Sequence, residues 1–383
     1  MDDRKPPLAP PGFAREELLE LLRHCEQFPL TVLLAPAGSG KSTLLAHWQA
    51  SRAPGSVVHY PLQARDNEPV RFFRHLAEAI RAQVEEFDVS WFNPFAAAMY
   101  QAPGVVGEYL ADALNRIDTR LYVVLDDFQF INQPTILDVL LAMLERLEGP
   151  VRVILSGRNH PGFSLSRLKL ENKLLYIDQH DLRLSPTQIQ LLNAHLGGPE
   201  LSADYIDGLM AMTEGWMAGV KVALLAYARF GTVALERFNG SQPEIVDYFG
   251  HVVLKRLSPQ MHDFLLSCAL FERFDGELCD HVLERSGSAL LLEDLAAREL
   301  FMLPVAEQPG CYRYHALLHD FLAKRLSLHK PLEVPRLHGR AALVFRQRGE
   351  LEPALLHAQR CDEPALFQAL LEEACDLWVR TGH

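Results

Sequence analysis

The sequence contains no C-x-x-C pair, because its six cysteines are spread widely along the 383 residues. Zinc sites and thioredoxin-like motifs need cysteines at such short spacings, so neither is indicated. No apolar run reaches the roughly 18 residues that a membrane-spanning helix requires, and the first residues lack the basic-then-apolar layout of a secretory signal. These absences predict a cytoplasmic protein with reduced cysteines and no membrane partner.

Positive charge is also scarce. Lysine and arginine number 37 against 49 aspartates and glutamates, which gives a formal net charge of −12. Affinity for duplex DNA depends on neutralising phosphates with basic side chains, so we expect this chain to bind DNA poorly by itself. A hydrophobic content of 49% with 22% charged residues is typical of globular proteins. The length exceeds that of one ordinary core and predicts two to four domains.

The first half of the chain alternates short apolar runs with helix-sized segments. Continuous hydrophobicity within each run indicates strands that are covered on both faces, as in a parallel sheet. Strand–helix alternation of this kind predicts an α/β fold of three layers. The predicted strands are Thr31–Ala35, Val57–Tyr60, Leu121–Leu125, Val151–Leu155 and Leu174–Ile177.

The second half lacks such runs and is predicted to be helical. Ser185-Pro186 has the residues of a helix start, and helical periodicity continues through Ala203 to Ala228. Short runs at Met302–Val305 and Tyr312–Tyr314 flank a Pro-Gly turn and predict the hairpin of a winged helix. The last part resembles the opening of a helical repeat array. Because such arrays need about three or more repeats, we expect a piece of a longer protein.

Residues 35–42 spell A-P-A-G-S-G-K-S, a phosphate loop in which Ala35 replaces the usual first glycine. Glycines let successive backbone N–H groups curl around a phosphate, lysine adds a point charge, and the following helix N-terminus favours an anion. An apolar strand precedes the loop and a helix follows it. The expected nucleotide-binding residues here are Pro36, Ala37, Gly38, Ser39, Gly40, Lys41, Ser42 and Thr43, with the helix beginning at Thr43 and the Ser42 hydroxyl suited to Mg²⁺.

Acidic residues end one of the predicted strands, where Leu121–Leu125 runs into Asp126 and Asp127. Ligand sites in parallel sheets lie at the carboxyl ends of strands. We therefore expect Asp126 to hold Mg²⁺ and Asp127 to orient or deprotonate the attacking water. Lys41 and Asp127 are the catalytic candidates.

One further residue at a strand end is a candidate for contact with a nucleotide. Arg158 follows the strand Val151–Leu155 and could reach a γ-phosphate. From chemistry alone, His315 fits a helix cap or a packed residue, and Arg15 fits an ordinary arginine at a helix start.

Six segments together carry a resemblance to a known family. They are P-A-G-S-G-K-S at 36–42, H-Y-P-L-Q-A-R-D-N-E-P-V-R-F at 59–72, V-V-L-D-D-F at 123–128, L-S-G-R at 155–158, E-G-W-M-A-G-V at 214–220 and Y-R-Y-H-A-L-L-H-D-F-L at 312–322. In order and spacing they resemble the MalT-like branch of the STAND signal-transduction ATPases, which includes large LuxR-type transcription activators. The resemblance covers nearly the whole chain.

The resemblance implies a P-loop core followed by a helical lid, a winged helix and a helical arm. It implies adenine nucleotides (ATP or ADP), Arg158 as a γ-phosphate sensor, His315 against the β-phosphate of ADP, and Arg15 near the nucleotide. The lid of the family often carries a proline that is missing from G-W-M-A-G-V, which puts its contact with adenine in question. The predicted domains are 1–183 (nucleotide-binding), 184–240 (lid), 241–330 (winged helix) and 331–383 (arm).

The leading functional hypothesis is a molecular switch that rests with ADP and is activated by inducer plus ATP, with slow hydrolysis at most. By resemblance, the inducer would be sensed by a missing C-terminal array, activation would permit self-association, and DNA would be bound only through an absent helix-turn-helix domain. Two alternatives stay open. One is a turnover ATPase of the AAA+ remodelling type, and the other is an interaction scaffold stabilised by nucleotide.

Overall fold

A computed structural model describes residues 13–88, 99–231, 239–240, 242–297, 301–305 and 308–381. Within them the chain divides into two compact units. The first contains the described residues up to Ser202 together with Gly215–Lys221, and the second contains Ala203–Glu214 and the described residues from Val222 onward. Each unit is described separately below.

A five-stranded parallel sheet is the centre of the first unit. The strand order is β2-β3-β4-β1-β5, so β1 lies between β4 and β5 and is separated from β3 by one strand. The strands are β1 (Leu30–Leu34), β2 (Val57–Pro61), β3 (Leu121–Asp126), β4 (Val151–Gly157) and β5 (Leu174–Ile177). All five strands lie within one residue of a predicted strand at their starts, and the predicted α/β fold is confirmed.

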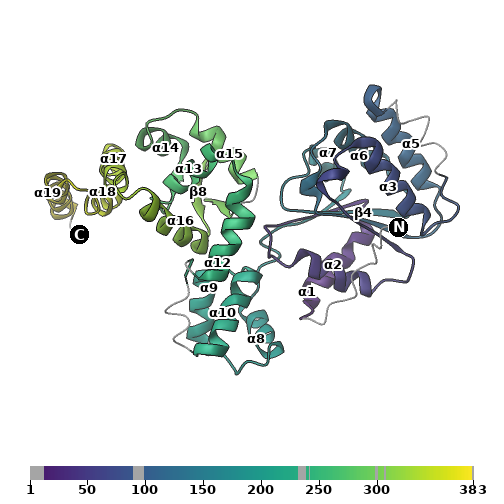
Figure 1. Ribbon diagram of the computed structural model, residues 1–383, viewed down its shortest axis with the longest axis horizontal. Coiled ribbons are helices and arrows are strands. Elements are labelled where there is room, and N and C mark those ends of the chain that lie inside the picture. Colours follow the sequence, from purple (N-terminus) through teal and green to yellow (C-terminus); the bar gives the residue numbers. More distant parts are fainter. Residues whose placement is uncertain are drawn as a thin grey trace. The chain divides into compact units, whose positions relative to one another are not determined.

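Helices cover both faces of this sheet (Figure 1), with α1 and α2 on one face and α3, α5, α6 and α7 on the other. The α-helices are α1 (Glu16–Arg23), α2 (Lys41–Ala50), α3 (Pro69–Arg81), α5 (Pro103–Asn115), α6 (Pro134–Arg146), α7 (Ser166–Leu170) and α8 (Pro186–His195). Short 3₁₀ turns are η1 (His24–Gln27), η2 (Ala64–Asp66) and η3 (Phe128–Phe130). Helix α2 begins at Lys41 rather than at the predicted Thr43, because the helical backbone starts directly after Gly40.

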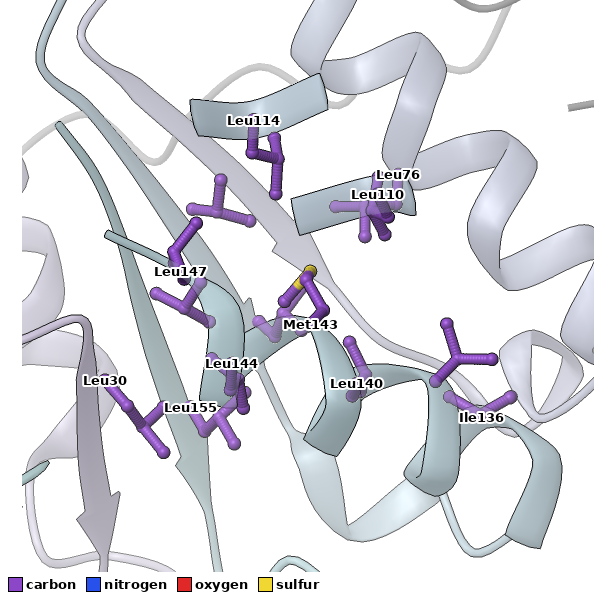
Figure 2. Close-up of a cluster of buried hydrophobic side chains, with 14 of the residues drawn as sticks. Leu30, Leu76, Leu110, Leu114, Ile136, Leu140, Met143, Leu144, Leu147 and Leu155 are labelled. Atoms are coloured by element: carbon purple, nitrogen blue, oxygen red, sulfur yellow. The ribbon is translucent and has the colours of Figure 1, made fainter. Parts of the chain in front are cut away.

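Alternate residues of each strand enter different cores. In β1, Leu30, Val32 and Leu34 pack under α3, α5 and α6, whereas Leu33 packs under α1 and α2. Figure 2 shows the larger core, in which leucines of α6 meet Leu30 and Leu155 of the sheet. Burial on both faces explains why the central strands β1, β3 and β4 are nearly continuous apolar runs, whereas the edge strands β2 and β5 are only partly buried. Because all the strands pair in parallel, their carboxyl ends lie at one edge of the sheet.

Helix α8 begins as predicted at Ser185. The Ser185 hydroxyl accepts a hydrogen bond from the Gln188 amide (3.2 Å), and the Gln188 side chain accepts one from the Ser185 amide (3.3 Å). The helical stretch predicted from Ala203 to Ala228 is two helices, α9 (Ala203–Thr213) and α10 (Met217–Phe230). The chain turns between them because Glu214 and Gly215 both have positive φ, at 48° and 74°.

The second unit contains the winged helix. Strands β7 (Met302–Pro304) and β8 (Cys311–Tyr314) form the predicted antiparallel hairpin, and the two-residue strand β6 (Phe274–Asp275), which was not predicted, pairs with β8. Part of the predicted turn, Ala306 and Glu307, lies outside the described residues. The surrounding helices are α12 (Pro243–Tyr248), the π-helical turn η4 (Phe249–Val253), η5 (Leu254–Arg256), α13 (Pro259–Cys268), α14 (Gly276–Val282), α15 (Ser288–Ala297) and α16 (Ala316–His329).

Three more helices follow, α17 (Val334–Gln347), α18 (Leu351–Ala358) and α19 (Pro364–Thr381). The predicted linker at Pro331–Pro335 is shorter in the structure, because α17 already starts at Val334. The predicted linker at 239–243 includes Ser241, which lies outside the described residues. None of the helices in the described part of the chain is long and apolar enough to cross a membrane. The four predicted domain ranges remain predictions.

Candidate nucleotide site

The phosphate loop joins the end of β1 to the start of α2. Gly38 and Gly40 have φ of +74° and +89°, a left-handed backbone that residues with a Cβ adopt at a cost. Gly40 is the residue directly before α2, so the loop delivers the chain straight into the positive end of that helix. The loop backbone therefore has the left-handed turns that its glycines predict, and it leads into a helix N-terminus of the kind that favours an anion.

The side chain of Lys41 is folded into this loop. Its ammonium group donates to the carbonyl oxygens of Ala35 and Pro36, the latter at 3.0 Å, and the residue is only 9% exposed. Ser42 and Thr43 are exposed in the first turn of α2. The loop thus holds a buried positive charge and presents two hydroxyls beside it.

Asp126 ends β3 and is buried, with 6% of its surface exposed. Its Oδ1 accepts a hydrogen bond from the Asp127 amide at 3.0 Å, and its Oδ2 lies 3.7 Å from Nε2 of His59 on β2. Burial raises the pKa of this carboxyl, but interactions with His59, Ser156 and the Asp127 amide outweigh that effect and keep the pKa below its usual value. Asp126 is therefore a carboxylate at neutral pH.

Asp127 has a left-handed backbone, with φ 58° and ψ 41°. Its Oδ1 accepts a hydrogen bond from the Gln129 side-chain amide at 2.7 Å. The Gln129 carbonyl oxygen in turn accepts one from the backbone amide of Arg158 at 3.2 Å. The structure thus joins Asp127 and Arg158 through Gln129, a residue that the sequence did not single out.

The segment after α9 packs directly on the phosphate loop. The Trp216 indole donates to the Ala37 carbonyl at 3.1 Å, and the Ala218 amide donates to the Gly38 carbonyl at 3.0 Å. A Cβ on Gly38 would lie 2.8 Å from the Cβ of Ala218. Although the segment lacks the family's proline, it contacts the phosphate loop. The sequence singled it out only through the resemblance.

A cavity of about 280 Å³ lies beside the loop, within the first unit. Gly40, Thr43 and His47 form the wall toward α2, and Leu192 and His195 form the wall toward α8. Its other lining residues are Phe13, Arg15, Leu44, Leu196, Met217 and Lys221. Apolar and ring side chains next to a phosphate cradle suit the base and sugar of a nucleotide.

Arg15 lies in the wall of this cavity, but its guanidinium is already engaged. Its Nη1 donates to the Leu182 carbonyl at 2.8 Å, and its Nη2 donates to the Arg183 carbonyl at 2.7 Å and to Gln188 at 3.0 Å. Burial lowers its pKa to about 10, partly offset by Glu17. Arg15 thus ties the start of α1 to the chain that enters α8.

His315 belongs to the second unit, where it is buried and caps α16. Its Nδ1 accepts from the Leu317 amide at 3.3 Å, so Nε2 carries the proton and donates to the Thr213 carbonyl at 2.7 Å. Next to it, Arg313 holds the Glu214 carboxylate through two bonds of 2.7 and 2.9 Å. The helix cap expected from chemistry alone is present.

The stretch 213–218, which we call the connecting segment, is therefore held at both ends. Thr213 and Glu214 are bound by His315 and Arg313 within the second unit, whereas residues from Gly215 to Ala218 belong to the first unit. Gly215 accepts a hydrogen bond from the Leu184 amide at 2.8 Å. Only one peptide bond separates the two sets of contacts.

The residues present fit a nucleotide with Mg²⁺. The left-handed glycines form the cradle, Lys41 supplies a charge, and the Ser42 hydroxyl and the Asp126 carboxylate are oxygen ligands of the kind that Mg²⁺ prefers together with phosphates. Within the described residues, no group of three or more His, Cys, Asp or Glu side chains could hold a metal ion by itself. A metal held by one carboxylate, one hydroxyl and the phosphates needs no such group.

Comparison with known proteins agrees with this geometry. Residues 23–161 match the sequence model of the AAA domain, and residues 250–334 match that of the MalT winged helix domain. The serine/threonine-protein kinase PknK of Mycobacterium tuberculosis is 29% identical over 373 residues, which cover 96% of this chain and 34% of the kinase. The transcriptional regulator MalT of Klebsiella pneumoniae is 25% identical over 362 residues, which cover 93% of this chain and 40% of the regulator.

A Walker-type ATPase of Pyrococcus abyssi has a similar fold, with a TM-score of 0.53 at 15% identity over 82% of this chain and 96% of that one. The chain thus spans little more than a third of the length of the curated relatives named above. The AAA match implies nucleotide binding, and the resemblance to MalT-like proteins is confirmed. The chain is a MalT-like P-loop protein that joins an AAA-type nucleotide-binding domain to a MalT-type winged helix.

Proposed function

We propose that the chain is the ATP/ADP-dependent switch module of a transcriptional regulator, resting with ADP and activated by inducer together with ATP. Hydrolysis would be slow and would reset the switch. The name of the MalT relative, an HTH-type transcriptional regulator, motivates the regulatory setting. The inducer, self-association on activation, and DNA binding through a helix-turn-helix domain belong to the same proposal.

In this proposal the phosphate loop, residues 36–43, binds the phosphates, with Lys41 at the β- and γ-phosphates. Mg²⁺ is held by Ser42 and Asp126. Asp127 orients the attacking water, and Arg158 contacts the γ-phosphate. The positive φ of the loop glycines and the ionised state of Asp126 support these assignments.

The connecting segment is the observation that carries the switch proposal. Trp216 and Ala218 donate hydrogen bonds to carbonyls of the phosphate loop, and two to five residues earlier Glu214 and Thr213 are held by the winged helix. A change in the loop on exchange of ADP for ATP would therefore act on the connecting segment, which the winged helix also binds through Arg313 and His315. His315 would then donate a hydrogen bond from Nε2 to the β-phosphate of ADP instead of to the Thr213 carbonyl.

Arg15 enters the proposal in a different way. Its guanidinium donates hydrogen bonds to the chain leading into α8, so it would shape the wall beside the base rather than bind phosphate.

The switch also requires that ATP and ADP bind the resting and the activated arrangements of the protein with different affinity. Moving a two-state equilibrium from 1:99 to 99:1 takes a preference of about 10⁴-fold.

The test begins by denaturing the purified protein and identifying any released nucleotide by chromatography. Near-stoichiometric ADP supports the resting state, and its absence together with no ATP or ADP binding on titration would refute nucleotide binding. Next, the oligomeric state and the preference for ATP over ADP are measured for the wild type, Arg158→Ala and His315→Ala. Unchanged preference and unchanged oligomeric state in both variants would refute the switch. Steady turnover near 1 s⁻¹ or faster would favour the turnover ATPase.

A further inference from the structure

Gln129 lies in the short turn η3 that follows β3. Its neighbours Phe128 and Ile131 are buried in the larger core, at 2% and 5% exposure. With these two side chains anchored, the half-buried side chain of Gln129 extends to the carboxyl ends of β3 and β4. The left-handed backbone of Asp127 turns the chain back so that this is possible.

The orientation of the Gln129 amide is fixed by its two partners. Oδ1 of Asp127 accepts the hydrogen bond at 2.7 Å, so its partner is the NH₂ group of Gln129. The backbone of Arg158 can only donate, so the partner at 3.2 Å is the carbonyl oxygen. A side-chain amide is neutral and carries a hydrogen-bond donor and an acceptor side by side, as these two partners require. Leucine or methionine would satisfy neither partner.

Both partners have a role in the proposed function. Asp127 orients the attacking water, and Arg158 contacts the γ-phosphate. A carboxylate that must orient water within a few tenths of an ångström needs a fixed rotamer, and one of its oxygens is fixed by Gln129. The backbone at Arg158 is fixed by the same amide. One side chain therefore sets the relative position of both groups at adjacent strand ends.

We propose that Gln129 is a positioning residue that holds Asp127 and Arg158 in register for ATP hydrolysis and for discrimination of ATP from ADP. The inference rests on the proposed function of those two residues. Gln129 itself need not touch the nucleotide. Its removal should therefore leave ADP binding intact and impair the steps that depend on the γ-phosphate.

Two substitutions distinguish the contribution of the hydrogen bond to Asp127 from that of the hydrogen bond from Arg158. Gln129→Met removes both, whereas Gln129→Glu keeps an acceptor for Arg158 and replaces the donor to Asp127 with a like charge. We expect both variants to bind Mg·ADP within about 2-fold of wild type and to hydrolyse ATP in single turnover at least 10-fold more slowly. The rate of Gln129→Glu should recover as the pH falls, because a protonated glutamate again donates to Asp127. A purely structural role would instead weaken Mg·ADP binding together with hydrolysis in both variants.

Gln133→Met is the matched control, because Gln133 precedes α6 and makes no side-chain cap there. It should hydrolyse ATP like the wild type. Asp127→Asn separates the two levels of the argument. If it abolishes hydrolysis while Gln129→Met does not, the positioning role is overturned and the proposed function stands. If the wild type binds no nucleotide, the proposed function itself fails.

Slow wild-type hydrolysis does not remove the test. If turnover is below detection, the affinity ratio of a non-hydrolysable ATP analogue to ADP is measured instead. Gln129→Met should change this ratio by about 3-fold or more, because the backbone that carries Arg158 loses its partner. An unchanged ratio would overturn the positioning role.

Discussion

The phosphate loop and the junction between β8 and α16 both hold the connecting segment, but they are built differently. The loop uses the backbone carbonyls of Ala37 and Gly38, and its path depends on positive φ at Gly38 and Gly40. The junction uses two side chains, Arg313 and His315, whose partners lie 99 and 102 positions earlier in the chain. One site is therefore local and shaped by the backbone, whereas the other depends on contacts that exist only in the folded unit.

This difference predicts which changes alter ligand binding and which alter only the transmission of its effect. Changes in the loop should act on nucleotide affinity directly. Changes at the junction should alter the stability of the second unit and the response to nucleotide, with affinity nearly intact. Three substitutions test this division.

The largest expected effect is that of Lys41→Ala. The buried ammonium group is the charge that the loop offers to the phosphates, and charge-assisted contacts to phosphate are among the strongest polar interactions. We expect affinity for Mg·ADP and Mg·ATP to fall about 100-fold or more, measured by titration calorimetry. Lys169→Ala, which removes an exposed lysine from α7, is the matched control and should bind normally.

Gly38→Ala should have the next largest effect. The new Cβ would meet Ala218 at 2.8 Å and the Trp216 ring at 3.1 Å, and φ of +74° costs an alanine on the order of 1–3 kcal/mol. We expect nucleotide affinity to fall about 10-fold and the contact with the connecting segment to loosen. The double variant with Ala218→Gly should recover part of the loss, since it removes the closest overlap but leaves the strain.

Gly197→Ala is the control for strain alone. Gly197 has φ of +78°, and a Cβ there would meet no atom within 4 Å. It should lower stability by about 1 kcal/mol in thermal unfolding and leave nucleotide affinity unchanged. Equal losses of affinity in Gly38→Ala and Gly197→Ala would show that packing on the loop is unimportant.

The same local-versus-distant division explains what could be predicted from the sequence. The strands of the sheet could be predicted because they are short apolar runs, which burial on both faces requires of the central strands β1, β3 and β4. The phosphate loop was predicted because its geometry demands glycines at fixed positions. The start of α8 was predicted because Ser185 and Gln188 satisfy each other within one turn.

Contacts between distant positions could not be predicted in this way. A glutamine in a short turn carries no local signal that it will bridge Asp127 and Arg158. Strand β6, at Phe274–Asp275, is too short for periodicity to reveal, and it exists because β8 offers a free edge. The hydrogen bond from Trp216 to Ala37 spans 179 positions. These features depend on how the folded elements meet.

The smallest expected effect is that of Glu214→Gln at the junction. Glu214 is 13% exposed and forms two charge-assisted bonds with Arg313, which is 39% exposed and therefore partly screened by solvent. Loss of the charge should lower the stability of the second unit by about 1 kcal/mol, seen in thermal unfolding. ADP affinity should change less than 2-fold, because the loop keeps its own contacts.

The junction and the loop are distinguished most clearly when ADP affinity and the change in oligomeric state between ADP and ATP are both measured in one variant. In Glu214→Gln we expect the change in oligomeric state between ADP and ATP to be reduced, whereas Glu293→Gln, an exposed residue of α15, should leave it as in the wild type. A Glu214→Gln protein that lost ADP affinity as severely as Gly38→Ala would contradict the division. The junction would then belong to the binding site itself, with Arg313 acting on the nucleotide rather than on the connecting segment.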